Sequence, residues 1–174
     1  KRVAAQLSDE FHGLKTFATL SPIPGFMNWL DAVFAEGKAG LLSASERKAL
    51  LHATGESRGA KGKLKALLSE HAWAENEKLS STLKPILLRL AACYLVDEKR
   101  GGVTALDPVA HFHMTNGAVM ERLNWLGDTS DKGFQQSAGI MINYLYDLAS
   151  IDDNHEAYAD SGRITASSDI RGLL

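Results

Sequence analysis

The sequence predicts a mixed α/β fold with more helix than strand. Apolar residues recur at helical spacing through most of residues 26–99, which is typical of amphipathic helices packed on a core. Residues 14–21 and 109–126 show instead a rough alternation of apolar and polar side chains, the pattern of strands. One strand and one hairpin are too few for a self-sufficient sheet, so we expect them to be the last part of a larger one.

The composition fits one globular domain, or a large part of one, in a reducing compartment. The 174 residues are 45% hydrophobic and 23% charged, which is enough to bury a core without disulfides. Cys93 is the only cysteine, so an intrachain disulfide and a cysteine-rich metal site are both excluded. Because it stands among apolar residues, we expect Cys93 to be a small core side chain.

Charge and hydropathy argue against two classes of partner. The 19 Lys and Arg residues against 21 Asp and Glu leave a formal net charge of -2, whereas nucleic-acid-binding proteins normally carry a basic excess. No apolar run reaches the roughly 18 residues needed to span a bilayer, and no signal peptide is visible. We therefore expect no nucleic acid and no membrane as partners, and a cytoplasmic location. Since the chain starts with Lys1 rather than methionine, we also expect a processed product or a fragment.

The first half of the chain is predicted to contain a helix, a strand, a sharp corner and then several helices. Apolar spacing predicts a helix over residues 1–14, and threonine and aromatic residues predict a strand over residues 14–21. The corner is Ser-Pro-Ile-Pro-Gly, residues 21–25. A capping box of Ser43 and Glu46 marks the start of one later helix. The helices expected after the corner cover residues 26–37, 43–55, 63–73 and 81–99.

The second half of the chain changes pattern. Alternating side chains flank Asn116-Gly117, which predicts a β-hairpin near residues 109–126. Residues 134–149 return to helical spacing and predict a helix. The tail, residues 150–174, is polar and loosely patterned, so we expect a surface loop with a short last helix.

Candidate functional side chains stand at three places: Ser21 at the corner, His111 and His113 in the predicted hairpin, and Tyr144 and Tyr146 in the predicted late helix. Two residues apart on a strand, both histidines would face the same side of the sheet. A zinc site needs further ligands at a recognisable spacing, and none is nearby, so no metal is expected. From the residues alone, a structural role is favoured, with one histidine in a hydrogen-bond network and the other facing solvent.

Ser21 has two interpretations. Serine before proline is common where a strand ends, because its hydroxyl can bond the local backbone. Pro22 also restricts Ser21 to extended geometry, so little entropy is lost when its side chain is aimed at a ligand. The second interpretation suits an active site, and the corner alone does not decide between the two.

Four segments taken together resemble a known family. In chain order they are TLSPIPGFMNWL, EKLSSTLKPILLRLAACYL, LDPVAHFHMTNGAVMERLNWLGD and SAGIMINYLYDL. In this order and at this spacing they look like the C-terminal catalytic domain of the malonyl-CoA decarboxylases. The likeness covers about residues 1–149, and the tail adds little to it.

The resemblance implies a fold similar to the GNAT acetyltransferases, with helical insertions and a helical oligomerisation domain upstream, and hence a homo-oligomer. It implies the conversion of malonyl-CoA to acetyl-CoA and carbon dioxide, within fatty acid metabolism, without a metal or an organic cofactor. The family's catalytic and substrate-binding roles fall on Ser21 and His113, and a further catalytic role falls on Tyr146. His111 is not at the matching position. Eukaryotic relatives are also mitochondrial or peroxisomal.

The implied reaction explains these residue types. Loss of carbon dioxide from malonyl-CoA leaves a thioester enolate, and hydrogen-bond donors preorganised around its oxygen lower the barrier. The α-carbon must then receive a proton, and an imidazole has a pKa suited to this near neutral pH. We hypothesise that His113 donates the proton, that Ser21 binds the departing carboxylate or His113, and that Tyr146 orients His113 or the substrate.

The chain departs from the family's pattern at both ends. In GNAT-like folds the CoA pyrophosphate binds a loop and the N-terminus of the following helix. That helix would be residues 1–14, so the loop, the early strands and an acidic residue of the family should precede Lys1. We therefore expect residues 1–174 to be the C-terminal part of the catalytic domain. The chain ends in Arg-Gly-Leu-Leu and lacks the peroxisomal Ser-Lys-Leu tripeptide of some eukaryotic relatives.

Two other functions stay open. A GNAT-type CoA-dependent acyltransferase would share the architecture, since only the site decides the activity, although no site for an acceptor amine is evident. A non-catalytic helical interaction module would be built on residues 43–99. The presence of serine, histidine and tyrosine together argues against this module, because a scaffold needs none of them.

Overall fold

A computed structural model describes residues 6, 10, 16–37 and 39–174, and it has the predicted mixed α/β fold. The helix predicted over residues 1–14 lies largely outside the described residues. The strands are β1 Phe17–Pro22, β2 Lys99–Arg100, β3 Thr104–Ala105, β4 Val119–Asn124 and β5 Met141–Tyr146. The helices are α2 Phe26–Ala35, α3 Ala44–Thr54, α4 Ala60–Leu68, the 3-10 helix η1 Ala72–Ala74, α5 Glu77–Val96, α6 Pro108–Thr115, α7 Asp131–Ser137, α8 Ile151–Ser161 and α9 Ser168–Arg171.

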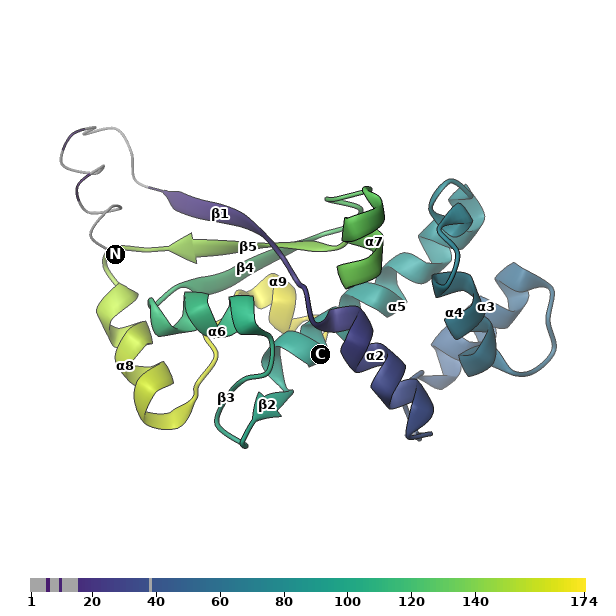
Figure 1. The fold of residues 1–174 in the computed structure, drawn as a ribbon, viewed down its shortest axis with the longest axis horizontal. Helices are drawn as coiled ribbons and strands as arrows, with labels where there is room; N and C mark the ends of the chain where they lie inside the picture. The colour runs from purple at the N-terminus through teal and green to yellow at the C-terminus, as the bar shows by residue number, and fades with distance from the viewer. Residues whose placement is uncertain (1–5, 7–9, 11–15, 38) are drawn as a thin grey trace.

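Three antiparallel strands form the main sheet, in the order β1-β5-β4 (Figure 1). Across β1 and β5, Ser21 pairs with Ile142 and Thr19 pairs with Tyr144. Since side chains alternate along a strand and paired residues share a face, these four side chains lie on the same face of the sheet. Helix α6 packs on this face, because the ring of its His113 stacks on the ring of Tyr144.

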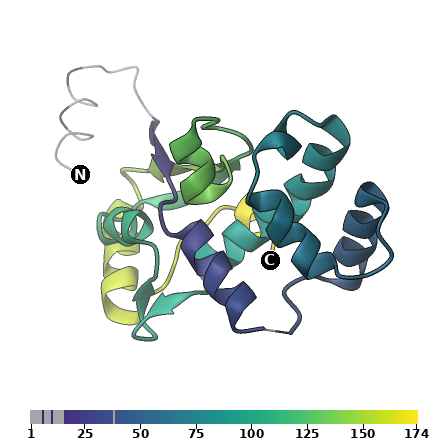
Figure 2. The ribbon, with the colours of Figure 1, turned by 45° about the vertical axis from the view of Figure 1, so that its right-hand side comes forward.

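The helices α3 and α4, with η1 and the start of α5, gather at the end of the molecule opposite α8 (Figures 1 and 2). Helix α5 connects this helical part to the sheet, and its side chains Leu83, Leu87 and Leu95 are fully buried. Among the described residues, α5 alone has the length and composition to cross a membrane, with half of the qualifying stretch buried inside the protein.

Most elements of the first half follow the prediction. The strand after the N-terminal segment is β1, and the helix after the corner is α2. Helix α3 begins with the predicted capping box, in which Ser43 Oγ accepts from Glu46 N–H and the Glu46 carboxylate accepts from Ser43 N–H. Gly55 ends α3 with a φ of 72°, a conformation that favours glycine.

The hairpin predicted near residues 109–126 is wrong, because its first half is helix α6. Asp107 caps α6 through the N–H groups of Val109 and Ala110, and Pro108 stands at the first helical turn, where a missing N–H costs nothing. Gly117 does turn the chain, but it does so just after the C-terminus of α6 rather than between two strands. His111 and His113 therefore point in different directions from a helix.

The late helix predicted over residues 134–149 is also wrong. Helix α7 ends at Ser137, and Ala138 and Gly139 both have positive φ, which stops the helix. The following segment is strand β5, in which Ile142, Tyr144 and Tyr146 lie on one face of the sheet and the residues between them lie on the other. In the tail, the predicted short last helix is confirmed as α9, whereas the expected surface loop contains helix α8.

Candidate active site

Ser21, His113 and Tyr146 form a continuous hydrogen-bonded chain. Ser21 Oγ lies 3.2 Å from His113 Nε2. On the other side of the imidazole, His113 Nδ1 lies 2.7 Å from the hydroxyl of Tyr146. The fold thus brings together the three residues that the resemblance selected, from β1, α6 and β5, and it places Ser21 in contact with His113, one of the two partners that we hypothesised for it.

Ser21 is held by the end of β1 and by the corner that follows. Its side chain is only 6% exposed, and Thr19 Oγ1 lies 3.0 Å from its Oγ. Ile23, between the two prolines, is fully buried in the core. Because proline fixes its own φ and restricts the residue before it, the corner leaves Ser21 little freedom to turn away from His113.

His113 is held in the last turn of α6 by the way this helix ends. Gly117 N–H donates to the carbonyl of Met114, and Ala118 N–H donates to the carbonyl of His113. This pair of bonds is a Schellman motif, which requires the left-handed conformation that Gly117 adopts with a φ of 75°. The motif fixes the backbone of His113, and therefore the direction of its imidazole.

The imidazole of His113 is buried between aromatic rings. It is 7% exposed and stacks on Tyr144, with ring centroids 4.0 Å apart and planes 15° apart. The ring of Phe112 meets it edge-on at 5.2 Å. Burial lowers the pKa of His113 to about 4, so the imidazole is neutral near pH 7. A neutral imidazole has one donor and one acceptor nitrogen, and both have a partner here.

The two tyrosines of β5 differ in what they offer to His113. Tyr146 is half-buried, gives its hydroxyl to the hydrogen-bonded chain, and has its pKa raised by burial, so the phenol stays protonated. Tyr144 is fully buried and offers only its ring face to His113. Its hydroxyl has no hydrogen-bond partner among the described residues, and burial raises its pKa well above the usual value.

His111 belongs to a different contact. Its Nδ1 lies 2.8 Å from the hydroxyl of Tyr158, which also accepts from the N–H of Ala105. This contact joins α6 to α8 and leaves His111 outside the hydrogen-bonded chain. The structural role expected of one histidine, in a hydrogen-bond network, therefore fits His111. The same interpretation expected the other histidine to face solvent, and this is wrong, because His113 is buried.

Asp107 lies close to the site and is a residue that the sequence prediction missed. Its side chain is fully buried and binds both α6 and the corner. The signal that could have identified it is the Asp-Pro pair, residues 107–108, which is typical of the start of a helix. With that helix recognised, a cap residue just upstream of His113 would have followed.

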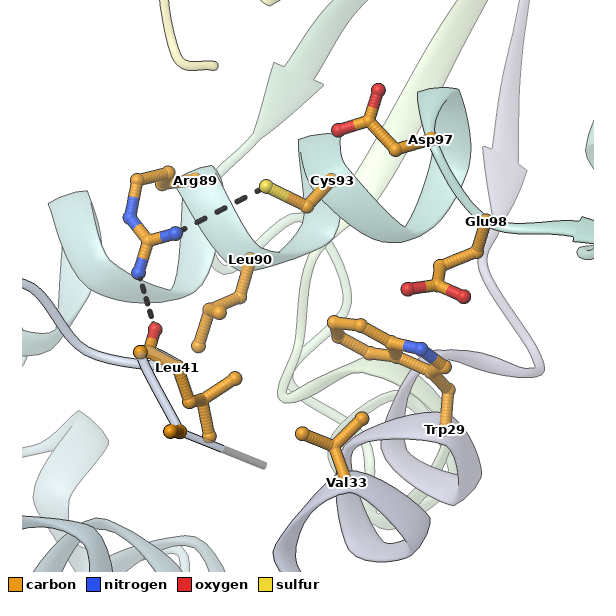
Figure 3. A pocket seen from close by; sticks show the side chains of 10 residues that line it. Trp29, Val33, Leu41, Arg89, Leu90, Cys93, Asp97 and Glu98 are labelled. Atoms are coloured by element: carbon orange, nitrogen blue, oxygen red, sulfur yellow. Dashed lines mark hydrogen bonds between the residues drawn. The ribbon is translucent and has the colours of Figure 1, made fainter. Parts of the chain in front are cut away.

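A separate pocket of about 240 Å³ lies between α2 and α5 (Figure 3). Arg89 at its wall donates to both oxygens of Glu46, at 2.6 and 2.8 Å, and to the carbonyl of Leu41, so its charge is already paired. Cys93 lines the pocket and is half-buried rather than a core residue as predicted. Burial raises the pKa of this thiol, which keeps it protonated.

A metal site is not evident in the part of the chain that the structure describes. No group of three or more His, Cys, Asp or Glu side chains lies close enough together there to hold an ion. The donors that meet at Ser21 are hydroxyls and a neutral imidazole, which suit proton transfer and the binding of an oxyanion.

Comparison with known proteins agrees with this geometry. The family model described as "Malonyl-CoA decarboxylase C-terminal domain" matches residues 1–174. The relatives named "Malonyl-CoA decarboxylase, mitochondrial" from Rattus norvegicus and Anser anser anser are 44% and 40% identical to this chain over its whole length. The alignments cover 36% and 35% of these relatives, so the chain spans about a third of their length.

Solved structures give the same result. The malonyl-CoA decarboxylase of Rhodopseudomonas palustris superposes with a TM-score of 0.84 at 41% identity, over 99% of this chain and 36% of that one. The enzyme of Agrobacterium vitis superposes with a TM-score of 0.82 at 38% identity, over 99% of this chain and 39% of that one. From its sequence and its fold alike, the chain belongs to the malonyl-CoA decarboxylase family.

Proposed function

We propose that Ser21, His113 and Tyr146 are the catalytic residues of a malonyl-CoA decarboxylase, with malonyl-CoA as the substrate. The observation that carries this proposal is the hydrogen-bonded chain from Ser21 Oγ through both imidazole nitrogens to the hydroxyl of Tyr146. It stands in a chain of the decarboxylase family, and it joins a hydroxyl that can bind an oxyanion, an imidazole that can deliver a proton and a phenol that can replace that proton.

The neutral imidazole changes how the proton is delivered. In the proposed step the bond between the α-carbon and the carboxylate breaks, and its electron pair forms the thioester enolate. The α-carbon then takes the proton of His113 Nε2 while Tyr146 passes its hydroxyl proton to Nδ1, so the imidazole stays neutral throughout. Once the product has left, Nε2 takes up one proton from solvent and Nδ1 returns its proton to Tyr146, which restores the starting state; this is the one proton that the overall reaction consumes.

Ser21 has the complementary role in this proposal. At rest its hydroxyl holds Nε2 of His113 in place. When the substrate is bound, the same hydroxyl donates to the carboxylate that leaves or to the oxygen of the enolate. No step needs a metal or an organic cofactor, so we expect a chelator to leave the turnover unchanged.

The test is turnover of the full-length protein with malonyl-CoA and no acceptor amine, measured as release of acetyl-CoA. We expect Ser21→Ala and His113→Ala each to lower kcat by about 100- to 1,000-fold, the usual loss for one well-aimed donor. His111→Asn is the matched control, because it removes a histidine from the same helix outside the site, and it should keep kcat.

Two results would overturn the proposal. One is near-normal turnover of His113→Ala or Ser21→Ala. The other is a strict need for an acceptor amine, which would favour the CoA-dependent acyltransferase instead. The homo-oligomer and the cytoplasmic location stay predictions, and the mass of the protein in solution tests the first of them.

A further inference from the structure

Asp107 is a buried carboxylate whose two oxygens bind different segments of the chain. The residue is 0% exposed. Oδ1 accepts from the N–H groups of Val109 and Ala110, both at 2.9 Å, in the first turn of α6. Oδ2 accepts from the N–H of Gly25 and from the hydroxyl of Tyr94, both at 3.3 Å.

The two segments are the ones that carry Ser21 and His113. Helix α6 holds His113 in its last turn, and Gly25 ends the corner that begins at Ser21. Two prolines make this corner stiff, so a displacement of Gly25 is transmitted to Ser21 rather than absorbed between them. The link through Asp107 therefore constrains the distance from Ser21 to His113.

The side chains around the contact between Asp107 and Gly25 are closely packed. A Cβ added at Gly25 would lie 2.0 Å from the hydroxyl oxygen of Tyr94 and 3.4 Å from Oδ2 of Asp107. The φ of Gly25 is -94°, which any residue can adopt, so glycine is needed here for space and not for its conformation. Tyr94 is itself buried and packs against Phe26 and Trp29 of α2.

A helix cap alone does not require this carboxylate. Serine or asparagine caps a helix about as well, whereas burying a carboxylate carries a desolvation penalty. Burial raises the pKa of Asp107, and the hydrogen bonds from Ala110, Gly25, Val109 and Tyr94 offset only part of the rise. What the carboxylate adds to a simple cap is Oδ2, which binds Gly25 and Tyr94.

We propose that Asp107 is a positioning residue that fixes Ser21 against His113 by binding both of the segments that carry them. It acts through this pair and does not touch the substrate. The inference rests on the proposed catalytic roles of Ser21 and His113, and it adds to them the part of the fold that sets their separation.

The experiment is a double-mutant cycle in the full-length protein. Asp107→Ser keeps an oxygen that can cap α6 and removes the one that binds Gly25. We expect kcat with malonyl-CoA to fall by about 100-fold, as for a small misplacement of a catalytic group, with KM little changed. In a Ser21→Ala background the same change should have almost no further effect on kcat, because no hydroxyl is left to position.

A control and a second variant keep the test decisive. Asn76→Ala removes the N-cap of α5 and should lower stability without changing kcat. If Asp107→Ser does not fold, Gly25→Ala takes its place in the cycle. The added Cβ displaces the corner, while the cap of α6 stays intact. We expect the same loss of kcat, and again almost no further loss in the Ser21→Ala background.

The outcomes separate this inference from the proposed function. The positioning role is overturned if kcat is unchanged in whichever of Asp107→Ser and Gly25→Ala folds. It is also overturned if that variant lowers kcat by the same factor with and without the Ser21 hydroxyl. In both cases the catalytic roles stand. Near-normal turnover of Ser21→Ala itself overturns the catalytic roles, and the positioning role with them.

Discussion

The titration of His113 couples the site to folding stability. Its pKa is about 4 in the folded protein against an ordinary value of 6.5, so between these two pH values the unfolded chain binds more protons than the folded one. The contribution of the neutral His113 to the free energy of unfolding is therefore complete above pH 6.5, and it should decrease as the pH falls from about 6.5 to about 4. We expect this decrease to be smaller in His113→Gln, which has no group to titrate there. Urea unfolding of both proteins across this pH range measures the difference, and identical pH dependences would contradict a buried neutral imidazole.

The site residues show what the resemblance could and could not supply. It selected Ser21, His113 and Tyr146, and their contacts agree with that selection. It did not supply the stacking of His113 on Tyr144, the burial that lowers the pKa of the imidazole, or the bonds of Asp107. These depend on which side chains the fold brings to one face of the sheet, and no local pattern in the sequence records that.

The turn at the C-terminus of α6 has no room for a side chain at Gly117. A Cβ at Gly117 would lie 2.0 Å from the backbone oxygen of Ile151, which cannot move as a side chain could. Gly117→Ala should therefore cost more than the roughly 1–2 kcal/mol of the left-handed conformation alone. Gly55→Ala is the matched control, because Gly55 ends α3 with a similar φ of 72° and a Cβ there would meet nothing within 4 Å. Unfolding free energies of the two variants give the comparison, and equal losses would show that the contact with Ile151 has no effect.

Elements with their own start and stop signals were predicted well, and elements defined by the sheet were not. Helix α3 has a capping box and a terminal glycine, and its bounds were predicted nearly to the residue. The segment of α6 alternates apolar and polar residues over too few positions to separate a helix from a strand, and Asn116-Gly117 serves equally as a hairpin turn or a helix end. Strand β5 is flanked by two strands and has apolar or aromatic side chains on both faces, so its sequence lacks a clean alternation and resembles a helical pattern.

The helical part and the sheet share one hydrophobic core, and this sets how the protein opens. Buried residues of α3, α4, α5, α6 and β5 form a single cluster, and Trp73 of η1 packs against Trp125 and Phe134 next to the sheet. A cavity made in the middle of α5 should therefore destabilise the sheet as much as the helices, because both parts are stabilised by the same core.

Leu87→Ala tests this coupling, since Leu87 is fully buried in α5 and its truncation should cost about 2–5 kcal/mol. In hydrogen exchange of the full-length protein, we expect amides of α5 and of β5 to lose the same free energy of protection. Lys84→Ala, an exposed position on the same helix, should leave both unchanged within about 0.5 kcal/mol. Loss of protection confined to α5, with β5 still protected, would mean that the helical part opens by itself and that the geometry of Ser21, His113 and Tyr146 is independent of it.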